Sequence, residues 1–294
     1  MIQFSNVVKH FRRNEVLKGI DLNIKRGQRV ALVGSNGAGK TTLIRCLLGE
    51  YNCQGGVSID GLDPRSSRQE VLSKVGFVPQ LPPPLRMPVG QLVSFAASLC
   101  QSDPERILNV SGQLGFDARQ FKYHPFVKLS GGQKQKLLIA IALGRDTELL
   151  VMDEPAANLD PEARHILFKL LAKKQDSCAM LISSHRLDEV ASLVNRVVEM
   201  DQGKIVLDDE VADLVDMSSQ LSCRITMVQP EDAFMKALTE WQFKADDASQ
   251  AVWNGFIAGP DRLRFLGMLS RYAALLSGVE MNEVKEHKNA ENVA

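Results

Sequence analysis

The sequence predicts an α/β domain with a mostly parallel sheet, an antiparallel β layer and a helical insert, followed by a small α+β domain. Three observations lead to this prediction. Apolar runs of strand length alternate with segments of helical periodicity over the first two thirds of the 294 residues, a pattern typical of a parallel sheet. The alternation starts afresh near Met217, which indicates a second domain. A hydrophobic content of 45% can fill at least one sizeable core.

The elements of the first domain follow a simple order. Residues 2–8 and 16–24 alternate in polarity and read as two edge strands of a small antiparallel layer. A buried strand at 28–34 leads into a glycine-rich loop and a helix at 41–49. The other expected elements are strands at 55–61, 74–80, 148–154 and 178–185, a helical stretch over 91–124, and helices starting near 131 and 161.

The C-terminal part repeats the alternation on a smaller scale. Its expected elements are strands at 221–228, 250–259 and 278–286 and helices at 230–241 and 260–276. We therefore expect an α/β domain at 1–216, with the helical insert at about 88–145, a small domain at 217–286, and a flexible tail at 287–294.

Charge and composition exclude several classes of protein. The 35 basic residues balance 35 acidic ones, so no overall field recruits nucleic acid or a membrane surface. The five cysteines form no C-x-x-C pair, which favours reduced thiols in the cytoplasm. No apolar run reaches the roughly 18 residues that a membrane span needs, and residues 1–16 lack the continuous apolar stretch of a signal peptide. We expect a soluble, cytoplasmic chain without direct membrane insertion.

A phosphate-binding loop is the strongest motif. The stretch "GSNGAGKT", residues 34–41, fits G-x-x-x-x-G-K-[ST]. Backbone N–H groups of such a loop and of the following helix point at phosphate oxygens. Lys40 is expected to reach the β- and γ-phosphates, and Thr41 to ligate Mg²⁺. The expected nucleotide contacts are Gly34, Ser35, Asn36, Gly37, Ala38, Gly39, Lys40, Thr41 and Thr42. The chain is expected to bind a nucleoside triphosphate.

Two carboxylates end an apolar strand further along the chain, in "ELLVMDE". On their own, such residues often mark only a strand that reaches solvent. After a phosphate-binding loop, Asp153 is expected to hold Mg²⁺ through water. Glu154 is expected to polarise the water that attacks the γ-phosphate, or to accept its proton.

Three further residues are assigned a role only because the phosphate-binding loop and the two carboxylates are present. Gln80 ends the strand at 74–80 and is expected to touch both the metal and the attacking water. His185 ends the strand at 178–185 and is expected to contact the γ-phosphate, although a lone histidine there is more often structural. Phe11 is expected to stack on adenine, although an aromatic residue at that place is equally ordinary core.

The stretch "LSGGQ", residues 129–133, allows two compatible interpretations. Ser130 and Gln133 form S-x-x-Q, a capping box that starts a helix. Capping does not require Gly131 and Gly132, which lower helix propensity. Glycines in a first turn let a phosphate approach the free N–H groups, so this helix start is also expected to hold a phosphate.

Together these motifs resemble the ATP-binding cassette (ABC) ATPases. The resemblance rests on the loop at 34–41, Gln80, "LSGGQ", "LLVMDE", "NLD" at 158–160 and His185, all in family order over about residues 1–212. Phe11 replaces the more usual tyrosine, and Lys134 and Lys136 stand where arginines are common.

The resemblance implies a homodimer held together by ATP. In the family, "LSGGQ" of one chain closes over the ATP in the other chain's phosphate-binding loop. Ser130, Gly131, Gly132 and Gln133 would then contact the partner's nucleotide, and Asp160 would lie at the shared interface and pass the state of one site to the other. Binding would close the dimer and hydrolysis would open it.

The resemblance also implies a membrane partner. The expected function is that of the ATPase subunit of a transporter, on the inner face of the cytoplasmic membrane, with a separate transmembrane permease docked near residues 80–99. The layout of the C-terminal domain resembles ABC-2-type exporters and the copper-processing ATPase for nitrous oxide reductase maturation. This favours export or mechanical work. The alternative is a soluble non-transport ABC ATPase, such as one for iron–sulfur assembly.

Overall fold

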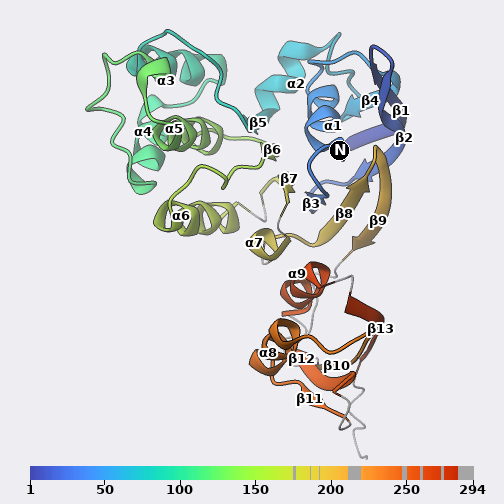
Figure 1. Ribbon diagram of the computed structural model, residues 1–294. Helices are drawn as coiled ribbons and strands as arrows, with labels where there is room; N and C mark the ends of the chain where they lie inside the picture. Colours follow the sequence, from blue (N-terminus) through green and yellow to red (C-terminus); the bar gives the residue numbers. More distant parts are fainter. Residues whose placement is uncertain are drawn as a thin grey trace, which may run out of the picture. The chain divides into compact units, whose positions relative to one another are not determined.

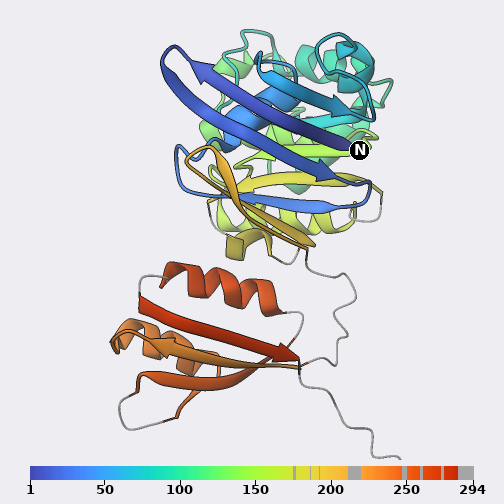
Figure 2. The same ribbon diagram turned by 90° about the vertical axis from the view of Figure 1, so that its right-hand side faces the viewer.

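The computed structural model describes residues 1–174, 177–185, 187–191, 193–210, 220–246, 250–258, 261–272 and 275–283. The chain divides into two compact units, Met1–Val211 and Ala212–Ala294 (Figures 1 and 2). The expected domain boundary after residue 216 and the expected tail at 287–294 lie outside the described residues.

The main sheet of the first unit contains six strands in its described residues, in the order β5-β6-β7-β3-β8-β9. The strands are β5 (Val75–Val78), β6 (Leu149–Asp153), β7 (Ala179–Ser184), β3 (Arg29–Val33), β8 (Arg196–Asp201) and β9 (Lys204–Glu210). All neighbours pair in parallel except β8 and β9. Strands β6 and β7 are buried along their whole length, as expected for a parallel sheet covered on both faces.

A smaller antiparallel sheet packs against the same core. It consists of β2 (Asn14–Ile24), β1 (Ile2–Phe11) and β4 (Gln54–Ile59), in that order within the described residues. The expectation that β1 is an edge strand is therefore wrong, because β4 pairs along its free side. Side chains from this sheet, from helix α1 (Lys40–Leu47) and from the main sheet share one hydrophobic core.

The remaining helices of the first unit include a group that builds its own core. The helices are α2 (Arg68–Lys74), α3 (Val89–Leu99), α4 (Pro104–Gln113), the 3₁₀ turn η1 (Phe126–Lys128), α5 (Gly131–Leu143), α6 (Pro161–Ala172) and α7 (Leu187–Val190). Helices α3, α4 and α5 lie together in Figure 1 and pack around the fully buried Phe126. The described residues contain no helix long and apolar enough to cross a membrane.

The second unit is a split β-α-β arrangement. Its elements are β10 (Gln220–Met227), α8 (Asp232–Glu240), β11 (Lys244–Ala245), β12 (Val252–Ala258), α9 (Arg262–Arg271) and β13 (Leu276–Glu283). The strands pair antiparallel in the order β11-β12-β10-β13 over the described residues. Phe234 of α8 and Phe265 of α9 are fully buried against the sheet residues Ile225 and Trp253. Among the described elements of this unit, the two-residue strand β11 is the one that the sequence did not predict.

Candidate functional site

The loop between β3 and α1 depends on glycines in a left-handed conformation. Gly34, Gly37 and Gly39 have φ angles of 144°, 88° and 109°. A Cβ atom at Gly34 would lie 2.2 Å from the carbonyl oxygen of Met200, so only glycine fits there. Helix α1 begins after Gly39 without a side-chain cap, which leaves its first N–H groups for a ligand or water.

This loop borders a cavity of about 430 Å³. The cavity is lined by Val16, Ser35, Asn36, Gly37, Ala38, Gly39, Lys40, Thr41, Thr42, Gln80 and Glu154. The fold therefore brings the predicted loop residues from Ser35 onward to one place with Gln80 and Glu154. Val16 was not predicted, because a valine in a strand carries no chemical signal.

Lys40 places a cation at the centre of the loop. Its Nζ donates to the carbonyl oxygens of Gly34 (2.6 Å) and Ser35 (3.2 Å). Burial lowers the pKa of Lys40 below its usual range, while the carboxylates of Glu154 and Asp153 act in the opposite direction. The side chain is buried, so its charge acts on this cavity with little screening by solvent.

The two carboxylates end β6 and adjoin a serine of β7. Asp153 and Ser183 are register partners in the parallel ladder. The Ser183 hydroxyl donates to Asp153 Oδ1 at 2.6 Å and accepts from the backbone N–H of Glu154 at 3.0 Å. Glu154 has a φ angle of 50°, which costs a residue other than glycine about 1–3 kcal/mol. Ser183 was not predicted from the sequence, although a polar residue that ends an apolar strand is a usable signal.

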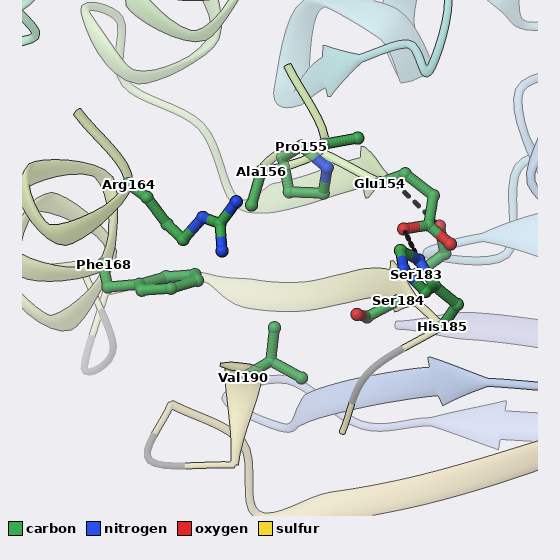
Figure 3. A pocket seen from close by; sticks show the side chains of 10 residues that line it. Glu154, Pro155, Ala156, Arg164, Phe168, Ser183, Ser184, His185 and Val190 are labelled. Carbon is green, nitrogen blue, oxygen red and sulfur yellow. Dashed lines mark hydrogen bonds and ion pairs between the residues drawn. The ribbon is translucent and has the colours of Figure 1, made fainter. Parts of the chain in front are cut away.

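His185 lies against the same glutamate. Its Nδ1 is 2.8 Å from Glu154 Oε2, and Nδ1 donates because an ionised carboxylate only accepts. The histidine side chain is 53% exposed and the glutamate side chain 8%. Figure 3 shows both residues with Ser183 at one end of a second cavity, of about 170 Å³, opposite Arg164 and Phe168. Glu154 thus borders two cavities.

The available oxygen atoms fit a magnesium ion that arrives with a nucleotide. Thr41 and Gln80 line the cavity, and Asp153 ends the adjacent strand. The described residues contain no group of three or more His, Cys, Asp or Glu side chains that could hold a metal. Mg²⁺ commonly binds through one or two protein oxygens and the phosphates of a substrate. Hydroxyl, amide and carboxylate oxygens suit that mode.

The "LSGGQ" stretch forms a complete capping box. Gln133 donates its backbone N–H to Ser130 Oγ (3.2 Å), and Ser130 donates its backbone N–H to Gln133 Oε1 (3.0 Å). Ser130 and Gly131 are exposed at the start of α5. None of the four predicted contacts in this stretch lines the cavity beside Lys40. Within one chain, the two predicted phosphate sites are separate.

Three other predicted nucleotide contacts, Gly34, Asp160 and Phe11, also lie outside that cavity. Asp160 caps α6 by accepting from the N–H of Ala163 at 2.8 Å. It also pairs with Lys136 of α5, and this hydrogen bond lowers the pKa of Asp160. Phe11 ends β1, is partly exposed, and packs edge to face against Tyr51, with ring centroids 5.2 Å apart.

Comparisons with known proteins agree with this geometry. The family model for ABC transporters matches residues 17–157. The Nod factor export ATP-binding protein I of Burkholderia lata is 30% identical over 90% of this chain and 88% of its own length. The aliphatic sulfonates import ATP-binding protein SsuB 1 of Agrobacterium fabrum is 34% identical over 71% of this chain and 74% of its own.

A solved structure has the same fold. It is a dimeric ATP-binding cassette in a post-hydrolysis state with bound ADP and phosphate, 24% identical, with a TM-score of 0.65 over 73% of this chain and 100% of that one. Two relatives at 30% identity or more, each covered by this chain over more than two thirds of its length, support the family assignment more strongly than the shared fold does. The chain belongs to the ATP-binding subunits of ABC transporters, which are ATPases of the P-loop cassette fold.

Proposed function

We propose that this chain hydrolyses MgATP as a head-to-tail homodimer and thereby drives a separate membrane-spanning subunit, in the direction of export. The observation that supports the chemistry is the meeting of Lys40, Thr41, Gln80 and Glu154 around one cavity. The remaining parts of the proposal rest on the exposed helix start at Ser130 and on an apolar groove in the first unit.

The residues of the cavity divide the chemistry among them. Lys40 exchanges its carbonyl partners for β- and γ-phosphate oxygens, and the loop N–H groups hold the phosphates in line. Glu154 orients the attacking water and accepts its proton. His185 lies outside this cavity but is bonded to Glu154 Oε2, and from there it would contact the γ-phosphate. Bound Mg²⁺ supplies charge neutralisation on the phosphates, and Thr41, Gln80 and Asp153 would hold it.

The glycines of "LSGGQ" are evidence that this helix start binds a phosphate of the nucleotide held by a second copy of the chain. A Cβ atom at Gly131 would meet nothing within 4 Å, and this glycine does not have a positive φ angle. Neither the fold nor the backbone of this chain therefore requires glycine at the first position of α5. A ligand that approaches the N–H groups closely explains the choice. Because the stretch is remote from its own cavity, the phosphate belongs to the partner copy.

An apolar groove supports the docking of a membrane-spanning subunit near residues 80–99. The groove has a volume of about 650 Å³ and lies between α2, β5, α3 and α5. Its apolar residues include Leu72, Phe77 and Phe95, and Arg68 and Arg145 also line it. Phe95 and Leu99 on α3 are 53% and 63% exposed, an arrangement typical of a helix-in-groove contact with a partner.

The direction of transport is the part of the proposal that rests on similarity. The Nod factor export relative aligns with 90% of this chain, which includes much of the second unit, whereas the sulfonate import relative aligns with 71%. This difference in coverage supports export. Copper processing for nitrous oxide reductase maturation stays a prediction from the sequence resemblance alone.

Glu154→Gln tests the proposed function most directly. The variant keeps the shape of the side chain but removes the proton acceptor, so we expect ATP binding without hydrolysis. With MgATP its mass by light scattering should double, from monomer to dimer, and ADP should leave it monomeric. A variant that hydrolyses ATP at the normal rate contradicts the role of Glu154. An ATP-bound variant that stays monomeric contradicts the shared site.

A further inference from the structure

Ser183 is a fully buried hydroxyl that contacts both acidic residues of the site. It donates to Asp153 Oδ1 and accepts from the Glu154 N–H, at 2.6 and 3.0 Å. The direction of both bonds is fixed, because a backbone N–H can only donate and an ionised carboxylate can only accept. The hydroxyl proton therefore points at Asp153.

One of these two hydrogen bonds constrains the side chain of Asp153, and the other constrains the backbone of Glu154. The first fixes the rotation of the Asp153 carboxylate and occupies one lone-pair direction of Oδ1. The second holds the N–H of a residue whose φ angle is 50°, a backbone conformation that persists only where its surroundings impose it. Parallel pairing of β6 with β7 sets the backbone of Ser183 directly beside Asp153, and a rotation of the side chain away from this position would break both bonds.

We infer that Ser183 is a positioning residue for ATP hydrolysis, which aims the Asp153 carboxylate at the metal and holds the Glu154 side chain at the cavity. The inference rests on the proposed roles of Asp153 and Glu154. Ser183 acts through them: it does not line the cavity beside Lys40, and its hydroxyl is already bonded to these two residues. Removing it should disturb the metal and the attacking water while nucleotide affinity changes little.

The expected loss has the size usual for a residue that orients a metal ligand. Such substitutions lower metal affinity or activity by about 10- to 100-fold. Ser183→Ala should therefore lower kcat by that factor and weaken metal binding by about tenfold. Ser183→Thr keeps the hydroxyl in a strand position that suits a β-branched residue and should restore both.

Ser111→Ala is the matched control. Ser111 is also fully buried, but its hydroxyl donates to the carbonyl oxygen of Leu108 at 3.0 Å, in α4. Each alanine substitution deletes one buried hydroxyl, but only the hydroxyl of Ser183 contacts Asp153 and Glu154. The experiment measures kcat and KM for ATP on the full-length chain. It also measures Mn²⁺ affinity, from the electron paramagnetic resonance signal of free Mn²⁺ in the presence of a non-hydrolysable ATP analogue.

The inference holds if Ser183→Ala loses activity and Mn²⁺ affinity while Ser183→Thr and Ser111→Ala keep both. It is overturned if Ser183→Ala matches the wild type, or if the threonine variant is as impaired as the alanine variant. If Ser183→Ala does not fold, Ser183→Cys takes its place, since a thiol keeps the shape of the side chain but is a weak hydrogen-bond donor. A wild-type Mn²⁺ affinity of Ser183→Cys then overturns the inference.

Glu154→Gln separates the two proposals. A fully active Glu154→Gln rejects the proposed function, whereas an inactive one beside a fully active Ser183→Ala rejects only the role of Ser183.

Discussion

The ammonium group of Lys136 on α5 lies 2.7 Å from Oδ2 of Asp160, the residue that caps α6. This ion pair joins the helix that begins with "SGGQ" to the loop that follows Glu154. The lysine end is mostly buried and the aspartate end half exposed. A displacement of the first turns of α5 relative to the start of α6 would therefore strain or break this ion pair within a single chain.

The Lys136–Asp160 pair should make stability depend on pH in acid. The hydrogen bond from Lys136 is the main cause of the lowered pKa of Asp160. Such a carboxyl stabilises the fold above its unfolded pKa of about 4 and loses that contribution as pH falls through its lower folded value. Lys136→Met should therefore lower the unfolding temperature at pH 7, and the difference from wild type should shrink progressively as the pH falls below about 4.

Lys134→Met is the control for this prediction, because it removes the same charge two residues earlier on the same helix. Unfolding followed by circular dichroism between pH 7 and pH 3 checks both variants. A difference between Lys136→Met and wild type that stays constant over the whole range would contradict the assignment to Asp160.

Gly131→Ala should separate folding from dimer formation. The added Cβ meets no atom of this chain, and alanine gains up to about 1 kcal/mol of helix propensity over glycine. The free energy of unfolding should rise or stay level. MgATP-dependent dimerisation of the Glu154→Gln protein should nevertheless weaken at least tenfold, because the methyl group would stand where a phosphate approaches. Light scattering as a function of protein concentration measures the dimerisation constant. Unchanged dimerisation would contradict the binding of a phosphate at this helix start.

Phe95→Glu should abolish membrane recruitment without affecting the ATPase site. Phe95 is half exposed in the groove beside α3, and a carboxylate there cannot be buried against an apolar partner without a large cost. Co-sedimentation with membrane vesicles that contain the permease measures recruitment. Val206→Glu places the same charge on another exposed apolar position, on β9, and should sediment like the wild type. Equal sedimentation of both variants would refute docking at this groove.

Gly34→Ala should destabilise the first unit by about 2 kcal/mol or more. Its Cβ would lie 2.2 Å from a backbone oxygen, at a φ angle of 144°, so strain and overlap add. Gly112→Ala, in an exposed part of α4 where the Cβ meets nothing within 4 Å, should stabilise slightly. Denaturant unfolding compares the two. A Gly34→Ala protein of normal stability that binds ATP would contradict this description of the loop.

The sequence predicted those parts of the site that are encoded locally. The glycines, Lys40 and Thr41 are adjacent in the chain, and Asp153 and Glu154 end one apolar run, so each group needs only its own segment to be recognised. The capping box of Ser130 and Gln133 is equally local, and it forms as predicted.

Features that arise from pairing between distant segments were missed. The central place of β1 depends on β4, about fifty residues away, and the role of Ser183 depends on Asp153, thirty residues away. The hairpin of β8 and β9 is local and was missed for a different reason. It turns on Gln202 and Gly203, both with positive φ angles. Its Gln-Gly turn is a weaker signal than Asn-Gly or Asp-Gly, and its charged strands lack a clear apolar run.

The strand order affects how heat inactivates this enzyme. Asp153 ends β6, Ser183 and His185 come from the end of β7, and Lys40 follows β3, three strands that are direct neighbours in the sheet. Backbone ladders through the most buried layer set the spacing of these groups, so no peripheral segment can loosen them separately. Heat should therefore abolish turnover and melt the sheet at the same temperature, and loss of turnover at a lower temperature would indicate dissociation of the proposed dimer.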